Sequence, residues 1–272
     1  MSIARLAKAL NLSISTVSRA LNNYDDVAPE TRRRVVAKAK ALNYRPNAAA
    51  RQLVSGSTRA IAVTLPIVEA GEEFIDWMYS GLLAGVSATL DGSGYYLIAT
   101  SAGARGIDRE MALYRNLIEG SSADALLIVR TLVDDPRVKL AQDAGIPFVT
   151  YGRTQTDVPY SWIDTDNEGA FALAANRQLG FGHRRIALLN GPSEFYFAQL
   201  RRRGYERALT AAGVALDPAL VAEGNLSIQS GYSLTMELLN QKTPPTAFLC
   251  AVDNMAFGAI SACRQRGLVV GR

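Results

Sequence analysis

Three side chains near the N-terminus, Ile14, Ser15 and Arg19, have the chemistry needed to read the edge of a base pair. The guanidinium of Arg19 can donate two hydrogen bonds to O6 and N7 of a guanine. The Ser15 hydroxyl can bond a base edge or a phosphate, and Ile14 can contact the methyl group of a thymine. These groups can act together only if a helix presents them to the major groove.

Two short helical patterns around a tight turn would present them in this way. The apolar positions of both patterns repeat at helical spacing: Ile3, Leu6 and Leu10 in the first, Val17 and Leu21 in the second. Between them, Asn11 tolerates the left-handed conformation that ends a helix, Leu12 can fill the turn, and Ser13 can cap the next helix. The pair predicts a helix-turn-helix, with an ordinary helical hairpin as the alternative.

The charge distribution favours the DNA-reading interpretation. Residues 1–59 contain 11 Lys and Arg against 3 Asp and Glu, a net charge of +8, whereas the remaining residues carry a net charge of −4. A cationic head suits the phosphate backbone, because each neutralised phosphate releases counterions. A solvent-exposed face would also explain an excess of basic residues, but it would not explain why this excess falls in the same residues as the two helical patterns. The head lacks a broad Leu/Phe/Trp face, so we expect no membrane partner.

A third helix and a short fourth helix follow the pair. Pro29 suits the first position of a helix over 29–42, whose basic side chains face outward. After Pro46, residues 48–54 can form barely two turns, which fold only when something packs against them. A plain linker is the alternative for this segment. We expect backbone contacts that set the register from Thr16, Tyr44 and Asn47.

Length and composition limit the number of domains and the classes of protein to which the chain can belong. The chain of 272 residues suits one large domain or two to three small ones. It has no apolar run near the roughly 20 residues that span a bilayer, no secretory signal, and no metal-ligand spacing around Cys250 and Cys263. We therefore expect a cytoplasmic protein with buried thiols, no metal and no cofactor. With one histidine and no recognisable enzyme motif, we expect no catalytic residues.

Beyond residue 59, strand-like and helical runs alternate. The strand-like runs are 60–66, 95–100, 124–129, 147–151, 160–164, 185–189 and 246–252. The helical patterns are 74–90, 108–119, 134–144, 167–179, 198–212 and 229–240. This alternation predicts an α/β body with doubly wound parallel sheets. Such sheets bind ligands at the carboxyl ends of their strands.

The head resembles the N-terminal signature of the lactose-repressor (LacI) family of bacterial transcription regulators. The matching residues are TVSRALN (16–22), Val27, Thr31, Arg32, Val35, Leu42, Asn43, Tyr44, Pro46, Asn47, Ala50 and Leu53. The resemblance continues in the body, through IAVTLP (61–66), DTDNEGA (164–170), LGFGHRRIALLNGP (179–192), RRRGYERAL (201–209) and PTAFLCAVDNMAFGAI (245–260). Family members generally continue well beyond Gly271 and Arg272, so we expect an incomplete C-terminus.

The resemblance implies an all-α helix-turn-helix head (1–46), a hinge helix and linker (47–58), and an effector-binding, dimerising body (59–272). The body would have two lobes, about 60–160 and from about 161 onward, like a periplasmic sugar-binding protein. The resemblance also implies that Leu53 is the hinge-helix leucine that wedges into the minor groove, where apolar side chains unstack and bend the duplex. Paired hinges imply a homodimer on a palindromic operator, and a tetramer stays open.

Several side chains near strand ends are candidate effector contacts: Phe74, Trp77, Asp164, Asp166, Phe195, Arg201 and Asp253. A sugar needs aromatic faces and fixed polar groups that converge in a cleft. The resemblance implies that Arg201 grips ligand hydroxyls. Core packing is the alternative for each aromatic residue, and helix capping for each carboxylate, since Asp166 or Asn167 suits a helix start. We expect His183, after Gly182, to orient a turn.

Together these features predict a repressor of carbohydrate-utilisation genes that binds double-stranded DNA and responds to a mono- or oligosaccharide. The effector would shift the angle between the lobes and so change the spacing of the hinges across the dimer. A regulator that responds to a non-sugar metabolite, such as a purine, is one alternative. A solute-binding protein is another, which the basic head and the lack of an export signal oppose.

Overall fold

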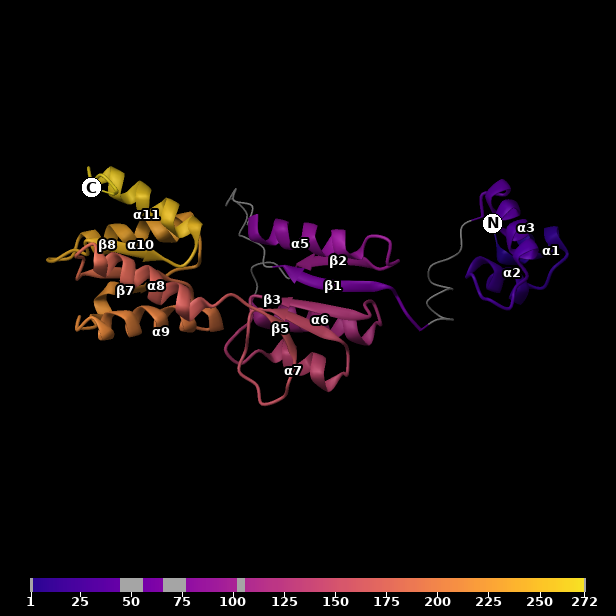
Figure 1. The fold of residues 1–272 in the computed structure, drawn as a ribbon, viewed down its shortest axis with the longest axis horizontal. Coiled ribbons are helices and arrows are strands. Elements are labelled where there is room, and N and C mark those ends of the chain that lie inside the picture. The colour runs from indigo at the N-terminus through magenta and orange to yellow at the C-terminus, as the bar shows by residue number, and fades with distance from the viewer. Residues whose placement is uncertain (1, 45–55, 66–76, 102–105, 272) are drawn as a thin grey trace. The chain divides into compact units, whose positions relative to one another are not determined.

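The computed structural model describes residues 2–44, 56–65, 77–101 and 106–271. The chain forms two compact units, Met1–Thr58 and Arg59–Arg272 (Figure 1). The first unit has one core cluster among its described residues, and the second has several. Within the described ranges, no helix is long and apolar enough to cross a membrane.

Residues 2–44, the first described part of the N-terminal unit, contain three helices, α1 (Ile3–Leu10), α2 (Ile14–Leu21) and α3 (Pro29–Ala41). Their apolar faces meet in a core formed by Leu6, Ala7, Val17, Ala20, Val27, Val35 and Ala39. Asn11 ends α1 in the left-handed region, with φ of 53°, and the Ser13 hydroxyl accepts the Thr16 N–H at 3.0 Å to cap α2. The predicted turn chemistry between the first two helices is therefore confirmed.

The first sheet of the body is parallel, with strand order β2-β1-β3-β4-β5. Its strands are β1 (Ala60–Leu65), β2 (Tyr96–Ser101), β3 (Ala125–Val129), β4 (Phe148–Tyr151) and β5 (Ser161–Ile163). Alternate residues of β1 and β3 enter opposite cores. One core packs against α6 (Ile107–Glu119) and α7 (Pro136–Asp143), and the other against α5 (Trp77–Leu90). The central strands are apolar on both faces because helices cover both.

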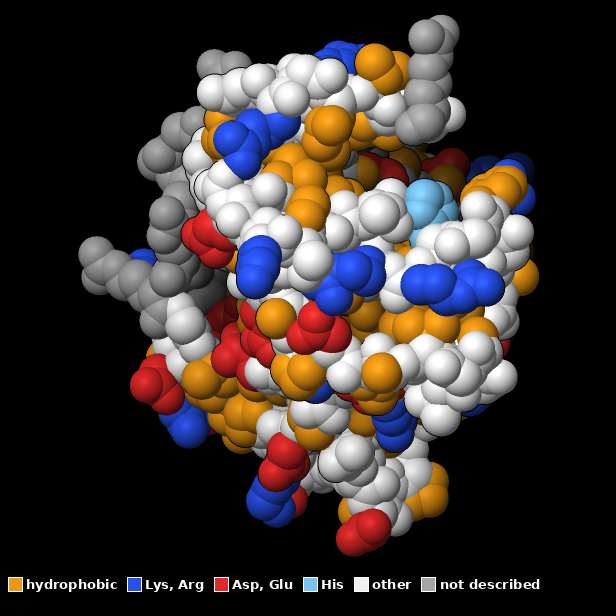
Figure 2. Space-filling model, turned by 90° about the vertical axis from the view of Figure 1, so that its left-hand side faces the viewer, with side chains coloured by type: hydrophobic (Ala, Val, Ile, Leu, Met, Phe, Trp, Pro, Cys, Tyr) orange, Lys and Arg blue, Asp and Glu red, His pale blue; other side chains and the backbone are white. Residues whose placement is uncertain are grey.

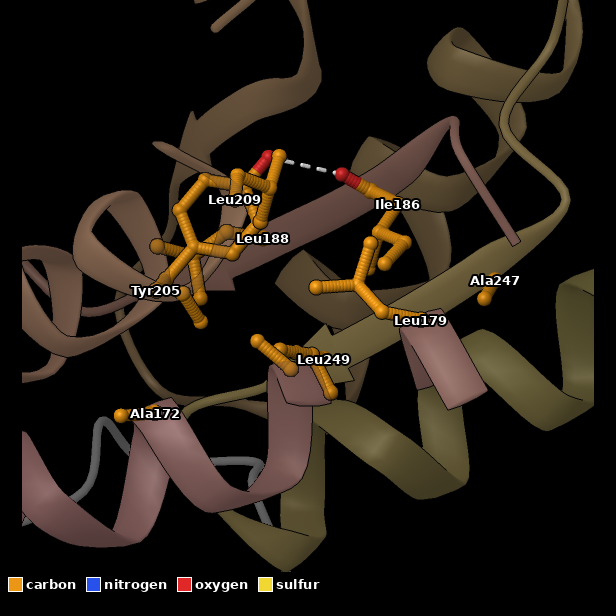
Figure 3. Close-up of a cluster of buried hydrophobic side chains, with 10 residues drawn as sticks. Ala172, Leu179, Ile186, Leu188, Tyr205, Leu209, Ala247 and Leu249 are labelled. Atoms are coloured by element: carbon orange, nitrogen blue, oxygen red, sulfur yellow. Dashed lines mark hydrogen bonds between the residues drawn. The ribbon is translucent and has the colours of Figure 1, made fainter. Parts of the chain in front are cut away.

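The second sheet is also parallel, with order β7-β6-β8. Its strands are β6 (Ile186–Asn190), β7 (Val221–Glu223), which follows the short helix η1 (Pro218–Leu220), and β8 (Ala247–Cys250). One face packs against α8 (Asn167–Gly180) and α9 (Tyr196–Ala211), and the other against α10 (Ile228–Leu239) and α11 (Asp253–Gln265). Figure 3 shows the first of these cores, where the Tyr205 hydroxyl donates to the Ile186 carbonyl at 2.8 Å.

Helices α8 and α9 approach each other closely at a glycine. A Cβ atom added to Gly204 would lie 2.1 Å from the carbonyl oxygen of Glu168 and 3.0 Å from the nitrogen of Ala172. Only glycine allows the two backbones to meet at this distance. The contact brings the first turn of α8 beside the middle of α9, where the predicted effector contact Arg201 lies.

The predicted fold class is confirmed. A helical head precedes two parallel sheets covered by helices, and the third helix of the head ends one residue earlier than expected. Three described elements were missing from the prediction, namely the short helix η1, the three-residue strand β7 and the helix α11. The first three residues of the helix predicted over 74–90 lie outside the described residues, and α5 accounts for the rest.

Candidate nucleic-acid interface and effector site

The outward face of α2 carries the three side chains predicted to read bases. Ile14 is 51% exposed, and Ser15 and Arg19 are also exposed, whereas Val17 and Ala20 of the same helix are buried. An isoleucine this exposed contributes little to the core, so α2 offers an apolar, a hydroxyl and a cationic group to a partner.

Arg19 is held by an aspartate and a tyrosine that the sequence did not indicate. Its Nη2 lies 2.6 Å from Asp26 Oδ2, and its guanidinium carbon lies 5.5 Å from the centre of the Tyr24 ring. Arg32 donates to the Tyr24 carbonyl at 2.6 Å and so fixes this loop. Because Arg19 and Asp26 are half exposed, their ion pair is worth little, and a guanine can replace the carboxylate.

The predicted backbone-contacting residues are only partly described. The Thr16 hydroxyl lies 2.8 Å from the Ser13 hydroxyl, beside the cap of α2. Tyr44 is half-buried against the core of the head. Asn47 and Leu53 lie outside the described residues.

In the body, Arg201 of α9 lies between a buried amide and two phenyl rings. Its Nε donates to Asn167 Oδ1 at 2.8 Å, and its Nη1 donates to the Ala251 carbonyl. The guanidinium carbon lies 4.7 Å from the centre of the Phe197 ring and 5.4 Å from that of Phe171. Burial lowers the pKa of Arg201 below its ordinary value, against the opposing charge of Asp164. The two hydrogen-bond acceptors of Arg201, the Asn167 amide oxygen and the Ala251 carbonyl, are neutral, so they compensate its positive charge only weakly.

Asp164 belongs to the same polar cluster. Its Oδ2 accepts Arg153 Nε at 3.0 Å, and its Oδ1 accepts Asn167 Nδ2 at 3.0 Å. The Arg153 guanidinium lies 5.1 Å from the centre of the Trp162 ring. The structure thus joins two predicted site residues, Asp164 and Arg201, through Asn167. Sequence reasoning missed Arg153 and considered Asn167 only as a helix cap.

The other predicted effector contacts have varied surroundings. Phe195 is buried, stacks on Phe197 at 5.6 Å between ring centres and carries the Arg130 guanidinium 4.8 Å from its ring centre, as the packing alternative expects. Asp166 caps α8 by accepting the Gly169 N–H at 2.9 Å, and Asp253 is exposed at the start of α11. Phe74 lies outside the described residues, and only the main chain of Trp77 is described.

Main-chain hydrogen bonds connect the segment after β3 with the start of α9. The Val133 N–H donates to the Glu194 carbonyl at 2.9 Å, and the Tyr196 N–H donates to the Thr131 carbonyl at 3.2 Å. The Thr131 hydroxyl donates to the Arg153 carbonyl at 2.6 Å. The element that carries Arg201 is therefore bonded directly to the first sheet's loops.

Another arginine, Arg137, is buried and supports this segment. It contacts Asp135 Oδ2 at 2.6 Å and Glu110 Oε2 at 2.7 Å, and it donates to the Arg130 carbonyl at 3.0 Å. Burial alone would lower the pKa of Arg137, but the hydrogen bond and charge of Asp135 raise it above its ordinary value. The cluster is a fully paired ionic anchor for the loop after β3.

The only histidine of the chain, His183, lies in the turn between α8 and β6, and Figure 2 shows it as the one pale blue side chain on a face that also carries Lys and Arg side chains. Its Nδ1 lies 2.9 Å from the Thr246 hydroxyl, which ties the turn after α8 to the segment before β8. Among the described residues, no group of three or more His, Cys, Asp or Glu could hold a metal ion.

Fold and sites together define a protein with a helix-turn-helix head and a sugar-binding-protein-like body. Residues 2–47 match the family model for bacterial regulatory proteins of the lacI family. Residues 74–271 match the model for periplasmic binding proteins and the sugar binding domain of the LacI family. The chain belongs to the LacI family of DNA-binding transcriptional regulators and is not an enzyme.

Individual relatives agree with this assignment. The HTH-type transcriptional regulator AglR of Rhizobium meliloti (strain 1021) is 36% identical over 274 residues, which cover 100% of this chain and 75% of AglR. The structure of a CelR–cellobiose complex has a TM-score of 0.69 and 31% identity, over 99% of this chain and 80% of that one. A Lac repressor dimer bound to operator and the anti-inducer ONPF has a TM-score of 0.83 and 29% identity, over 100% and 79% respectively.

Proposed function

We propose that this regulator is a cytoplasmic repressor of carbohydrate-utilisation genes, and that a mono- or oligosaccharide bound between the lobes of its body modulates operator binding. The arrangement around Arg201 supports this most directly. A guanidinium with neutral partners keeps donors for ligand hydroxyls, while Phe171 and Phe197 offer apolar faces to a sugar ring. Cellobiose in the CelR complex gives a precedent among similar proteins.

Arg201 and Asp164 are the central effector contacts of this proposal. Phe74, Trp77 and Asp253 complete the proposed contacts at the ends of other strands. Phe195 and Asp166 act through packing and capping, since the ring of one is buried and the carboxylate of the other caps α8.

On DNA, we propose that residues 1–46 form the reading head, with Ile14, Ser15 and Arg19 on base edges. Thr16, Tyr44 and Asn47 contact the backbone. Residues 47–58 form the hinge, in which Leu53 enters the minor groove, and residues 59–272 bind the effector and dimerise.

The proposed functional unit is a homodimer on a palindromic operator. Helix α5 has no charged residue, and exposed Met78, Tyr95 and Tyr96 lie on or near it. An uncharged helix with exposed apolar side chains beside it suits contact with a second copy of the chain. The Lac repressor structure, described as a dimer on its operator, is consistent with this assembly. Sedimentation of the purified chain distinguishes dimer, tetramer and monomer.

Calorimetry against a panel of sugars that includes cellobiose tests the effector proposal. We expect one sugar to bind and to change the affinity for operator DNA in a gel-shift titration. Binding of none of the sugars would contradict the effector proposal. Equal affinity of the wild type for operator and random DNA would contradict the DNA-reading proposal.

A purine is the second candidate effector. The two phenyl rings beside Arg201 could stack on a planar base as well as on a sugar. Adding adenine and hypoxanthine to the same calorimetric panel separates the two classes.

A further inference from the structure

Asn167 is a buried carboxamide placed between two groups of opposite charge. It is 3% exposed. Its Nδ2 donates to Asp164 Oδ1 and to the Thr165 carbonyl, both at 3.0 Å, while its Oδ1 accepts Arg201 Nε at 2.8 Å. The amide can therefore adopt only one orientation, with the donor side toward the carboxylate and the acceptor side toward the guanidinium.

Arg201 has one further anchor, the Ala251 carbonyl, which accepts from Nη1. Acceptors at Nε and Nη1 fix the plane of the guanidinium, because its donors form a rigid fork. The rings of Phe197 and Phe171 restrict the group further. A guanidinium held at these two positions can still donate from Nη2 and from the second hydrogen of Nη1.

We propose that Asn167 is the positioning residue for Arg201, and that it aims the remaining guanidinium donors at the hydroxyls of the effector. It also couples Arg201 to Asp164, and through Asp164 to Arg153 of the first lobe. The ligand part of this inference rests on the proposed function, whereas the positioning of Arg201 does not.

Neither aspartate nor alanine can replace the two hydrogen-bonding roles of the Asn167 amide. An aspartate would place a second carboxylate against Asp164 and remove the donor. An alanine would leave Arg201 Nε without its acceptor, so the guanidinium could rotate. The hydrogen-bonded series Arg201–Asn167–Asp164 therefore needs, at position 167, a neutral side chain that both donates and accepts.

A measurement without ligand tests the positioning directly. In the full chain, the Nε–H resonance of Arg201 is identified by its loss in Arg201→Lys. We expect its exchange with water to be at least about tenfold slower than that of exposed arginines, because the hydrogen is bonded to a buried acceptor. Unprotected exchange in the wild type would overturn the proposal without any variant of Asn167.

Asn167→Ala should remove this protection. The matched control is Glu168→Ala, which alters the next residue of α8 and breaks its 2.6 Å ion pair with Arg207 but leaves the bond to Arg201 intact. Protection should persist in the control. Equal protection in Asn167→Ala and the wild type would contradict the positioning role.

A double-mutant cycle tests the link to ligand binding, with cellobiose as the probe. Asn167→Ala should weaken cellobiose affinity on the order of tenfold when Arg201 is present, and should add no further loss in an Arg201→Lys background. Additive losses would show that Asn167 acts only on the stability of the fold and would refute positioning of Arg201 for the ligand. If neither cellobiose nor another panel sugar binds, the proposed effector class fails, while the exchange measurement still decides the role of Asn167.

Discussion

Arg137, beside the first sheet, is buried, and Arg201, beside the second sheet, is half-buried, and the neighbours of the two side chains differ. Arg137 contacts two carboxylates, Asp135 and Glu110, whereas Arg201 contacts an amide and a carbonyl. Their pKa values shift in opposite directions, upward for Arg137 through Asp135 and downward for Arg201 through burial. An arginine saturated by carboxylates is a structural anchor, while one with neutral partners still attracts polar groups of a ligand.

The largest expected effect is on the anchor. Arg137→Met leaves the buried carboxylate of Asp135 and the partly buried carboxylate of Glu110 without their cation, so we expect the free energy of unfolding to fall by about 3–5 kcal/mol. Urea denaturation of the full chain measures this loss. Arg115→Met is the matched control, because Arg115 is exposed on α6. A loss below about 1 kcal/mol would remove the distinction between the two arginines.

The next largest effect is expected at Arg201, the arginine with neutral partners. Arg201→Met should cost only about 1–2 kcal/mol of stability, because it removes hydrogen bonds to two neutral acceptors and strands no buried carboxylate. It should also weaken binding of the effector sugar by about a hundredfold, since a charged donor to the ligand is lost. Calorimetry and denaturation of one preparation give both values. Stability loss equal to that of Arg137→Met would argue that Arg201 is structural.

Arg19 extends the comparison to an exposed arginine with one carboxylate. Arg19→Ala should leave the stability of the head within about 0.5 kcal/mol, because its ion pair with Asp26 is at the surface. It should reduce the discrimination between operator and random DNA by about 1–3 kcal/mol. Fluorescence anisotropy at a fixed salt concentration measures both affinities. Unchanged discrimination would exclude Arg19 from base contacts.

The smallest effect concerns the carboxylate that holds Arg19. Asp26→Asn removes a negative charge close to the proposed DNA-reading face, so affinity for random DNA should rise by about twofold to threefold at low salt. Added salt should abolish the gain, because the effect is electrostatic. Weaker operator binding in this variant would instead mean that Asp26 orients Arg19 for its base.

Local patterns were sufficient for most of the fold. The capped turn between α1 and α2 depends on Asn11 and Ser13, which lie next to the residues they serve, so sequence alone predicted it. The strand β7 was missed because its sequence, VAE, has a single β-branched residue and ends on a charged one. Helix α11 could have been found, since Met255, Ala259 and Ala262 repeat at helical spacing and are buried.

The sites depended more on residues far apart in the chain. Glu110 and Arg137 are 27 positions apart, and Asn167 and Arg201 are 34 apart. No spacing rule predicts such pairs, because they form only after helices pack on the sheets. Arg201 was proposed through family resemblance and Asp164 through its position at a strand end, but the amide that connects them became visible only in the structure. The roles of Phe74, Asn47 and Leu53 stay predictions.

The missing side chain at Gly204 has a consequence for how the body can rearrange. Two backbones in van der Waals contact cannot slide past each other without a clash, so α8 and α9 must travel as a single block. Any rotation of this block relative to the first sheet would carry Asn167 and Arg201 together, and it would act on the chain before α8 and on the main-chain bonds between the loop after β3 and the start of α9.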